Sequence, residues 1–252
     1  MHKYLFLFFV ALCLISKVLS CDNGMNPYYS TPKQVPVPLS NVTGDELAYH
    51  QKYMQAVIDF AKAQQPKALF AASIVHKNGT QIVIGMNMGR AMNDGTQHAE
   101  IVVIQKANAL YGINNFTDYT LYTTGESCLM CQGAILYSGF SKVVYGTSIK
   151  TLYCDKCMSQ VPIDSTFLTA YGYGLADGWV RPTIIGGVLS NITDNEVFRN
   201  YCPNGTVSIF KIHPLCVVPT NSTNSTSSSD SAASSLTFSV FTLLVFISYL
   251  FI

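Results

Sequence analysis

Charged residues are scarce in this sequence of 252 residues. Only 12% of the residues are Asp, Glu, Lys or Arg, the formal net charge is +1, and no cluster of Lys or Arg occurs. Because binding of DNA or RNA depends on such basic patches, the composition disfavours a nucleic-acid partner. The length allows one domain of ordinary size with appendages at its ends.

The N-terminal apolar run is too short to span a membrane. Residues 5–15 are apolar, they follow a short basic start, and small Ser20 precedes Cys21. A helix that crosses about 30 Å of hydrocarbon needs about 20 apolar residues. We therefore interpret residues 1–20 as a secretory signal peptide rather than as a membrane anchor.

No basic residue follows the apolar C-terminal tail. Residues 217–235 contain a Ser/Thr/Asn/Ala-rich stretch, and residues 236–252 are apolar to the end of the sequence. A polar spacer before a terminal apolar tail is typical of a GPI-attachment signal. The alternative is a single-pass membrane helix, although the tail is only about 25 Å long at about 1.5 Å per residue and lacks stop-transfer Lys or Arg. We expect a GPI anchor in the outer leaflet of the cell membrane, on the extracellular face.

The N-glycosylation pattern N-x-Ser/Thr recurs through the chain. A single match is weak, but many matches behind a signal peptide predict a eukaryotic secreted glycoprotein. The acceptor asparagines are Asn41, Asn78, Asn115, Asn191, Asn204, Asn221 and Asn224.

The predicted domain occupies residues 45–216 and follows an extended, proline-containing leader over residues 21–44. Apolar residues recur at helical spacing over residues 45–64, with Thr43 as a possible cap and Pro66 as a stop. Two apolar runs then flank an Asn-Gly pair, which is a strong hairpin signal.

Strands and helices alternate through the domain. This alternation predicts an α/β fold, a three-layer α-β-α sandwich with a mixed five-stranded central sheet. The buried stripe of the second helix is expected to comprise Ile101, Val102, Ile104 and Leu110. The predicted strands are residues 68–75, 81–86, 120–123, 141–145 and 183–189, and the predicted helices are residues 45–64, 98–110, 128–137 and 196–201.

Four residues in two short stretches predict a metal centre. His98 and the pair Cys128 and Cys131, in C-x-x-C spacing, supply three ligands to a tetrahedral Zn²⁺ and leave the fourth position open for water. Glu100 is well placed to act as general acid and base on that water. A disulfide between the two cysteines is the alternative in a secreted protein, but the upstream His-x-Glu favours zinc.

Five further cysteines remain after removal of the signal peptide. Two disulfide bonds and one unpaired thiol account for them, with connectivity that the sequence does not define. The alternative is a second, structural zinc bound by the last four thiolates. The cysteines are Cys21, Cys154, Cys157, Cys202 and Cys216.

The wider pattern, H-x-E followed by C-x-x-C, resembles that of the cytidine and deoxycytidylate deaminase-like zinc superfamily. Residues 93–100 resemble the N-D-P-T-A-H-A-E run of guanine deaminases and tRNA adenosine deaminases, with Gly95 and Gln97 as departures. Residues 119–124 and 128–135 resemble the strand, the cysteine pair and the Gly-Ala-Ile helix of the same families. Ser127 stands where these families have proline, and it is able to cap a helix.

The resemblance implies a fold, a cofactor and a reaction. Zn²⁺ would be the cofactor, and Glu100 would move protons from the attacking water to the ring nitrogen and to the leaving ammonia. Asn87 lies where the families place a base-contacting asparagine, although asparagine after a strand is also a common turn residue. Glu126 either serves the site or anchors backbone amides in its loop.

We therefore expect a surface-anchored, zinc-dependent hydrolytic deaminase of a nucleobase or nucleoside, leaning toward purines and releasing ammonia. The resemblance also implies a homo-oligomer. It covers roughly residues 45–147 and fades beyond Tyr145, and the residues that would discriminate between substrates are expected after Lys150. The alternative is a catalytically silent surface glycoprotein that keeps the fold and uses its exterior for recognition or adhesion.

Overall fold

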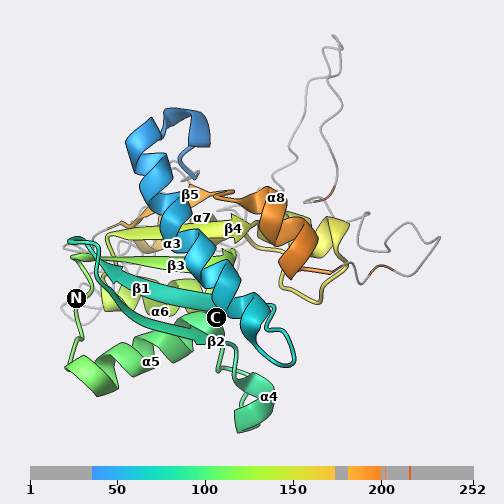
Figure 1. The fold of residues 1–252 in the computed structure, drawn as a ribbon, viewed down its shortest axis with the longest axis horizontal. Helices are drawn as coiled ribbons and strands as arrows, with labels where there is room; N and C mark the ends of the chain where they lie inside the picture. Colours follow the sequence, from blue (N-terminus) through green and yellow to red (C-terminus); the bar gives the residue numbers. More distant parts are fainter. Residues whose placement is uncertain (1–35, 174–180, 200–201, 203–215, 217–252) are drawn as a thin grey trace, which may run out of the picture. The chain divides into compact units, whose positions relative to one another are not determined.

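The structure is organised around one central sheet (Figure 1). This computed structural model describes residues 36–173, 181–199, 202 and 216. The signal peptide, most of the leader, the C-terminal stalk and the apolar tail lie outside the described residues. None of the helices in the described part of the chain combines the length and the apolarity needed to cross a membrane.

The described sheet contains five strands: β1 Ala71–His76, β2 Gln81–Met86, β3 Tyr119–Gly125, β4 Lys142–Thr147 and β5 Thr183–Gly186. Their order across the sheet is β2-β1-β3-β4-β5. β1 runs antiparallel to both of its neighbours, whereas β3, β4 and β5 are parallel. The predicted mixed five-stranded sheet is confirmed, with strand ends displaced by up to three residues.

The hairpin between β1 and β2 turns at the predicted Asn-Gly pair. Gly79 adopts a positive φ of 88°, which glycine accepts without a steric penalty. The side chain of Asn78 accepts a hydrogen bond from the backbone N–H of Thr80 at 2.9 Å. The local sequence therefore sets the turn, and the turn sets the pairing of the two strands.

One long helix covers one face of the sheet. Helix α3, Gly44–Ala63, crosses in front of the strands in Figure 1. Thr43 caps it, as predicted, by accepting a hydrogen bond from the Glu46 backbone N–H at 3.3 Å. Met54, Val57 and Ile58 are fully buried against this face. Their helical spacing explains why the segment folds as an amphipathic helix.

The other face of the sheet packs against α5, Ala99–Tyr111, and α6, Leu129–Ser138. In β1 the alternation of a strand sends Ala71 to the α3 side and Ala72 to the α5 side. The predicted stripe of α5 was partly wrong. Leu110 is 67% exposed, and small Ala107 is buried instead because the helix lies close to the sheet.

Past β4 the chain departs from the predictions. The short helical turns η2, Thr151–Asp155, and η3, Thr193–Val197, have π-type geometry, and α7 spans Ser165–Tyr173. The predicted helix over residues 196–201 was wrong in its bounds, since helical structure begins at α8, Ser190–Ile192, and Phe198 is already extended. The predicted fifth strand ends early because Gly187 and Leu189 have positive φ angles.

Shorter features complete the described chain. Helical turns η1, Leu39–Asn41, and α4, Gly89–Met92, precede α3 and α5 respectively. Val37, within the predicted leader, forms an isolated parallel bridge with Ile185 of β5. The last leader residues therefore extend the edge of the sheet.

Two disulfide bonds cross-link the C-terminal part of the chain. Cys154 is bonded to Cys216, and Cys157 is bonded to Cys202. The prediction of two disulfides is confirmed, and the alternative of a zinc bound by these four thiolates is wrong. Cys21 lies outside the described residues.

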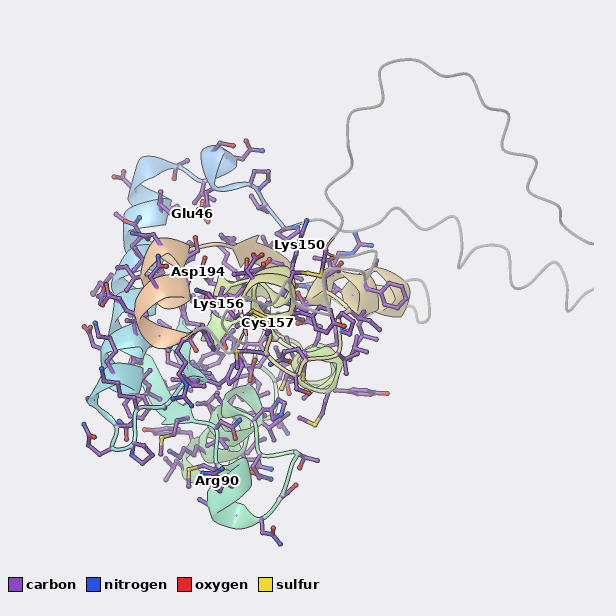
Figure 2. The ribbon with its side chains drawn as sticks, turned by 90° about the vertical axis from the view of Figure 1, so that its right-hand side faces the viewer. Glu46, Arg90, Lys150, Lys156, Cys157 and Asp194 are labelled. Atoms are coloured by element: carbon purple, nitrogen blue, oxygen red, sulfur yellow. A yellow bond between two sulfur atoms is a disulfide. The ribbon has the colours of Figure 1, made fainter. Side chains whose placement is uncertain are left out.

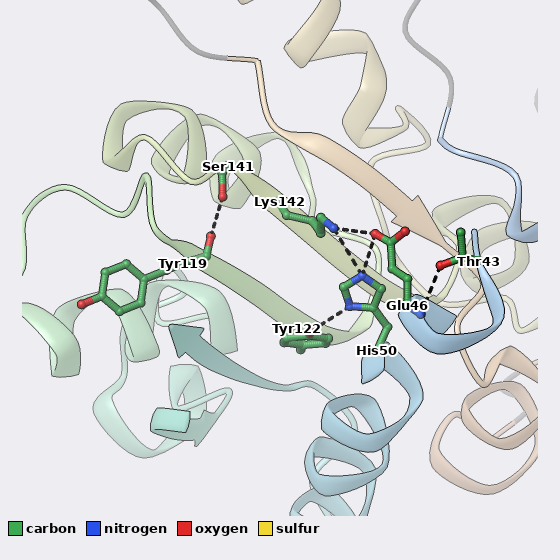
Figure 3. Close-up of polar contacts among 7 residues, drawn as sticks. All are labelled: Thr43, Glu46, His50, Tyr119, Tyr122, Ser141 and Lys142. Carbon is green, nitrogen blue, oxygen red and sulfur yellow. Dashed lines mark hydrogen bonds and ion pairs between the residues drawn. The ribbon is translucent and has the colours of Figure 1, made fainter. Parts of the chain in front are cut away.

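A partly buried polar cluster joins α3 to β3 and β4 of the sheet (Figure 3). Nδ1 of His50 lies 2.8 Å from the hydroxyl of Tyr122, and Nε2 lies 3.4 Å from the Lys142 ammonium. Lys142 also donates a hydrogen bond to Glu46 at 2.8 Å. Burial, followed by the charge of Lys142, lowers the pKa of His50 below 6.5.

This pKa shift predicts that His50 makes stability depend on pH. The unfolded chain binds a proton at His50 more readily than the folded chain, so the contribution is complete above about pH 6.5 and is lost as the pH falls. We expect the unfolding free energy of the zinc-loaded protein to fall between pH 7.5 and 5. The contribution of His50 to the slope is at most about 1.4 kcal/mol per pH unit.

Urea unfolding of the wild type and of His50→Gln across this range measures the effect. The variant should show a smaller acid loss, and the difference between the two proteins isolates the contribution of His50. His76→Gln, which removes a half-buried histidine of β1, is the control. Equal slopes in wild type and His50→Gln would rule out the assignment.

Candidate metal centre and active site

The predicted ligands lie where two helices begin on the same face of the sheet. His98 is the N-cap residue of α5, and Cys128 is the N-cap residue of α6. Cys131 follows in the first turn of α6 and is fully buried. β3 ends at Gly125, three residues before the first cysteine, so the strand delivers the pair to the start of the helix. The predicted meeting of the two helix starts is confirmed.

The three ligand atoms fit a tetrahedral zinc. Nδ1 of His98 lies 3.5 Å from the sulfur of Cys128 and 3.5 Å from the sulfur of Cys131. All three atoms lie within 4.8 Å of one another. Ligands at zinc bond lengths of about 2.0–2.3 Å and tetrahedral angles are about 3.5 Å apart, so the spacing suits this ion. No disulfide joins the two cysteines, which removes the alternative interpretation.

The two thiols differ in acidity because they interact. A hydrogen bond from Cys131 lowers the pKa of Cys128 to about 4. The same contact, together with burial, raises the pKa of Cys131. One sulfur is therefore a thiolate at neutral pH, and a divalent cation favours loss of the second proton.

Glu100 occupies the first turn of α5, close behind the histidine. Only 3% of the residue is exposed, and Oε1 accepts a hydrogen bond from the Thr123 hydroxyl at 3.4 Å. Burial raises the pKa of its carboxyl group. Such a buried carboxyl beside three metal ligands has the position that a proton-transferring group requires.

A cavity of about 220 Å³ opens at this centre. It brings together metal ligands, two carboxylates and several neutral side chains, and no Lys or Arg lines it among the described residues. The lining residues are Phe70, Asn87, His98, Glu100, Glu126, Cys128, Met158, Ser159 and Gln160.

Asn87 combines the two roles considered for it. Its side-chain oxygen accepts a hydrogen bond from the Gly89 backbone N–H at 2.8 Å, as in a turn. Its side chain also lines the cavity. Because the oxygen faces its own loop, the amide nitrogen is the group available to a ligand.

Glu126 anchors two loops beneath the cavity. Its carboxylate accepts hydrogen bonds from the backbone N–H of Ile149 at 2.9 Å and from the N–H and hydroxyl of Ser165, both at 2.8 Å. Burial raises its pKa, and these hydrogen bonds act in the opposite direction. The second sequence interpretation, an anchor for backbone amides, is confirmed.

Ser127 does not cap the helix, contrary to the expectation. The N-cap position belongs to Cys128, and no side chain caps α6. Ser127 is 1% exposed. Ser127 is therefore a small buried residue that lies before the helix and does not take part in its start.

Sequence reasoning did not identify four residues of the cavity: Phe70, Met158, Ser159 and Gln160. The last three lie in the region after Lys150 where substrate-discriminating residues were expected, but no motif marked them. Their proximity to the metal ligands depends on contacts between segments distant in sequence. The nearby Cys154 and Cys157 indicated that a disulfide bond could constrain this loop, but they did not indicate that the loop lines the cavity.

The family model described as the cytidine and deoxycytidylate deaminase zinc-binding region matches residues 47–147. A tRNA-specific adenosine deaminase of Rickettsia felis is 35% identical over 99 residues, which are 39% of this chain and 67% of that protein. The corresponding Rickettsia bellii protein is 35% identical over 95 residues, 37% of this chain and 63% of that protein. The chain belongs to this family of zinc-dependent hydrolytic deaminases, which confirms the predicted superfamily, zinc cofactor and enzyme class.

Solved structures confirm the fold. A crystal structure of a mutant of the protein NE0047 in complex with 8-azaguanine superimposes with a TM-score of 0.51 at 21% identity. The superposition covers 59% of this chain and 82% of that chain. The shared architecture is the mixed sheet with helices on both faces.

The ligand geometry predicts that loss of one thiolate abolishes zinc binding. We expect Cys131→Ala to reduce zinc affinity by more than about 100-fold, because a ligand matters more than the surrounding residues whose removal costs about 10–100-fold. Zinc per chain, measured by mass spectrometry after competition with a chelator, checks this. Met130→Ala, a change at the neighbouring part-exposed position, should retain zinc. Equal retention by both variants would exclude Cys131 as a ligand.

Proposed function

We propose that the protein is a zinc-dependent hydrolytic deaminase of a free nucleobase or nucleoside, with a preference for purines. The observation that carries the proposal is the cavity, which is lined by His98 and Cys128 of the candidate zinc-binding group, by the buried Glu100 and by several neutral side chains. The geometry suits hydrolysis of the carbon–nitrogen bond of an exocyclic amine.

The residues divide the chemistry between them. His98, Cys128 and Cys131 would hold a zinc ion, which would supply Lewis acidity to the attacking water. Glu100 accepts the two protons of that water in turn: it delivers the first to the ring nitrogen as the hydroxide adds to the carbon, and the second to the amino group, which leaves as ammonia when the carbon–nitrogen bond breaks. Phe70 and Met158 offer apolar surface to the faces of the base, and Asn87 offers a polar group to its edge.

Size and charge favour a small, neutral substrate. The cavity is smaller than the roughly 300–1,000 Å³ of pockets that accept drug-sized ligands. No Lys or Arg from the described residues lines it, so a phosphate group would find no basic side chain there. The preference for purines follows from the relatives named as tRNA-specific adenosine deaminases, which act on a purine. A tRNA substrate is disfavoured by the low charge of the whole chain.

A catalytically silent recognition protein is the competing proposal. In such a protein zinc would act only as a structural cross-link between α5 and α6. A structural site does not need a buried carboxylate beside its ligands, and keeping Glu100 buried without a catalytic role would cost stability. The position of Glu100 therefore favours the enzyme.

Ammonia release by the zinc-loaded ectodomain tests the proposal. The panel contains guanine, adenine, cytosine and their nucleosides, with a tRNA anticodon hairpin as the nucleic-acid arm. We expect turnover of one purine compound and a loss of at least about 100-fold in kcat for Glu100→Gln, because removal of a general acid and base costs about 10²–10⁴-fold. Zinc content should be unchanged in the variant.

Three other outcomes would count against this proposal. Turnover of the hairpin alone would assign the protein to tRNA editing. Silence across the panel from folded, zinc-loaded protein would support the recognition protein. Full activity in Glu100→Gln would show that another group transfers the protons.

We also propose that the chain follows the secretory pathway to the cell surface and carries a GPI anchor. Disulfide bonds such as Cys154–Cys216 and Cys157–Cys202 form and persist in oxidising compartments, which supports secretion. The acceptor asparagines in the described part of the chain are all exposed, as glycosylation requires: Asn41, Asn78, Asn115 and Asn191. Asn204, Asn221 and Asn224 lie outside the described residues.

Expression of the full chain in cultured eukaryotic cells tests this location. Peptide N-glycosidase treatment should increase its gel mobility, and phosphatidylinositol-specific phospholipase C should release it from intact cells. Asn78→Gln should increase the gel mobility of the untreated protein by the equivalent of one glycan. Asn114→Gln, outside any acceptor pattern, should leave the mobility unchanged. Retention after phospholipase treatment would indicate a single-pass membrane helix, and an unglycosylated intracellular product would contradict secretion.

A further inference from the structure

One side of the cavity comes from a segment beyond the part of the chain that matches the family. Met158, Ser159 and Gln160 are three consecutive residues that line the cavity with the metal ligands, and we name them the pocket wall. The family match ends at residue 147. This wall therefore lies outside the region that the family model matches.

The backbone turns sharply immediately before the pocket wall. The π-type turn η2 ends at Asp155, and Cys157 then adopts a left-handed conformation with φ of 53°. A residue with a side chain pays a conformational penalty in this region and stays there only when surrounding contacts hold it. One such contact is the hydrogen bond from the Met158 backbone N–H to the Leu152 carbonyl at 2.9 Å.

The two disulfide bonds supply covalent contacts at the same place. Cys157 is the residue directly before the wall, and it is bonded to Cys202, 45 residues further along the chain. Cys154 lies within η2 and is bonded to Cys216. Cys157 and its neighbour Lys156 are labelled in Figure 2. The turn before the wall is thus cross-linked at two positions, through Cys154 to Cys216 and through Cys157 to Cys202.

The chemistry of the wall suits recognition of a neutral base. The side-chain amide of Gln160 carries both donors and an acceptor, and the side chain is half-buried. The Met158 side chain is apolar and adapts its shape to a flat ring. Neither residue carries a charge that would attract a phosphate.

We propose that the pocket wall determines which base the enzyme accepts, with Gln160 as the specificity-determining residue and the Cys157–Cys202 disulfide as its positioning element. The inference rests on the proposed function and deepens it. The side-chain amide of Gln160 forms hydrogen bonds with the polar edge of the base. The disulfide keeps the amide at the depth where that edge lies.

Binding and turnover of the panel bases by the zinc-loaded protein test the role of Gln160. Gln160→Ala should lower kcat/KM for the preferred base by about tenfold, since a lost hydrogen bond of about 1.4 kcal/mol corresponds to that factor. It should also reduce the discrimination between the two best bases, because a base is distinguished by its polar edge. Gln105→Ala, at an exposed position of α5, is the matched control and should change neither.

Calorimetric binding in a Glu100→Gln background separates recognition from chemistry. Weaker binding of the preferred base on addition of Gln160→Ala, with zinc content unchanged, supports the proposal. Unchanged binding and unchanged discrimination would overturn the wall's role while leaving the proposed function intact. Failure of the wild type to bind or turn over any base would overturn both.

The paired variant Cys157→Ser/Cys202→Ser tests the positioning role. We expect KM for the preferred base to rise by about tenfold, while kcat falls less than threefold and one zinc per chain is retained, because the ligands lie on α5 and α6. Cys154→Ser/Cys216→Ser, which removes the cross-link further from the wall, should raise KM less. An unchanged KM in folded Cys157→Ser/Cys202→Ser, or an equal rise in both variants, would overturn the role assigned to this disulfide.

Discussion

The convergence of His98 with the cysteine pair is the constraint on which the rest of the structure depends. It requires two helices to begin side by side on one face of the sheet, with 3.5 Å between the histidine nitrogen and each sulfur. α5 and α6 satisfy this because both pack their apolar sides onto the same face. The parallel run of β3 and β4 places the ends of these strands at the edge where the ligands meet.

Buried polar groups then stabilise the loops around that edge. Glu126 connects the loop before the cysteines to Ile149 and Ser165, so three loops share one carboxylate. Each of these backbone N–H groups would otherwise be buried without a partner, which is costly. At the opposite end of the sheet, the cluster of His50, Tyr122 and Lys142 attaches α3 in the same manner. The central sheet is thus held by polar contacts at both ends and by apolar packing between them.

Much of the fold could be predicted because its signals are local. Thr43 caps α3, the Asn78-Gly79 pair turns the hairpin, and alternation along β1 divides the two cores. The errors follow from tertiary context. Leu110 belongs to an apolar pattern but is 67% exposed, because the packing of the helix against the sheet and not the pattern decides which residues are covered. The fifth strand stops early because Gly187 adopts a positive φ, which the apolar run around it does not reveal.

The sequence by itself pointed to His98, Cys128 and Cys131 as candidate zinc ligands and to Glu100 as the candidate proton-transferring group, because these residue types recur at fixed spacing within two short segments. The sequence also contains few charged residues, which disfavours a nucleic-acid substrate. Only the tertiary structure decided which cysteines pair, what Glu126 binds, and that Gln160 lines the cavity. These features depend on segments far apart in the sequence, 62 residues for the Cys154–Cys216 disulfide, and contacts at such separations produce no periodic pattern in the sequence.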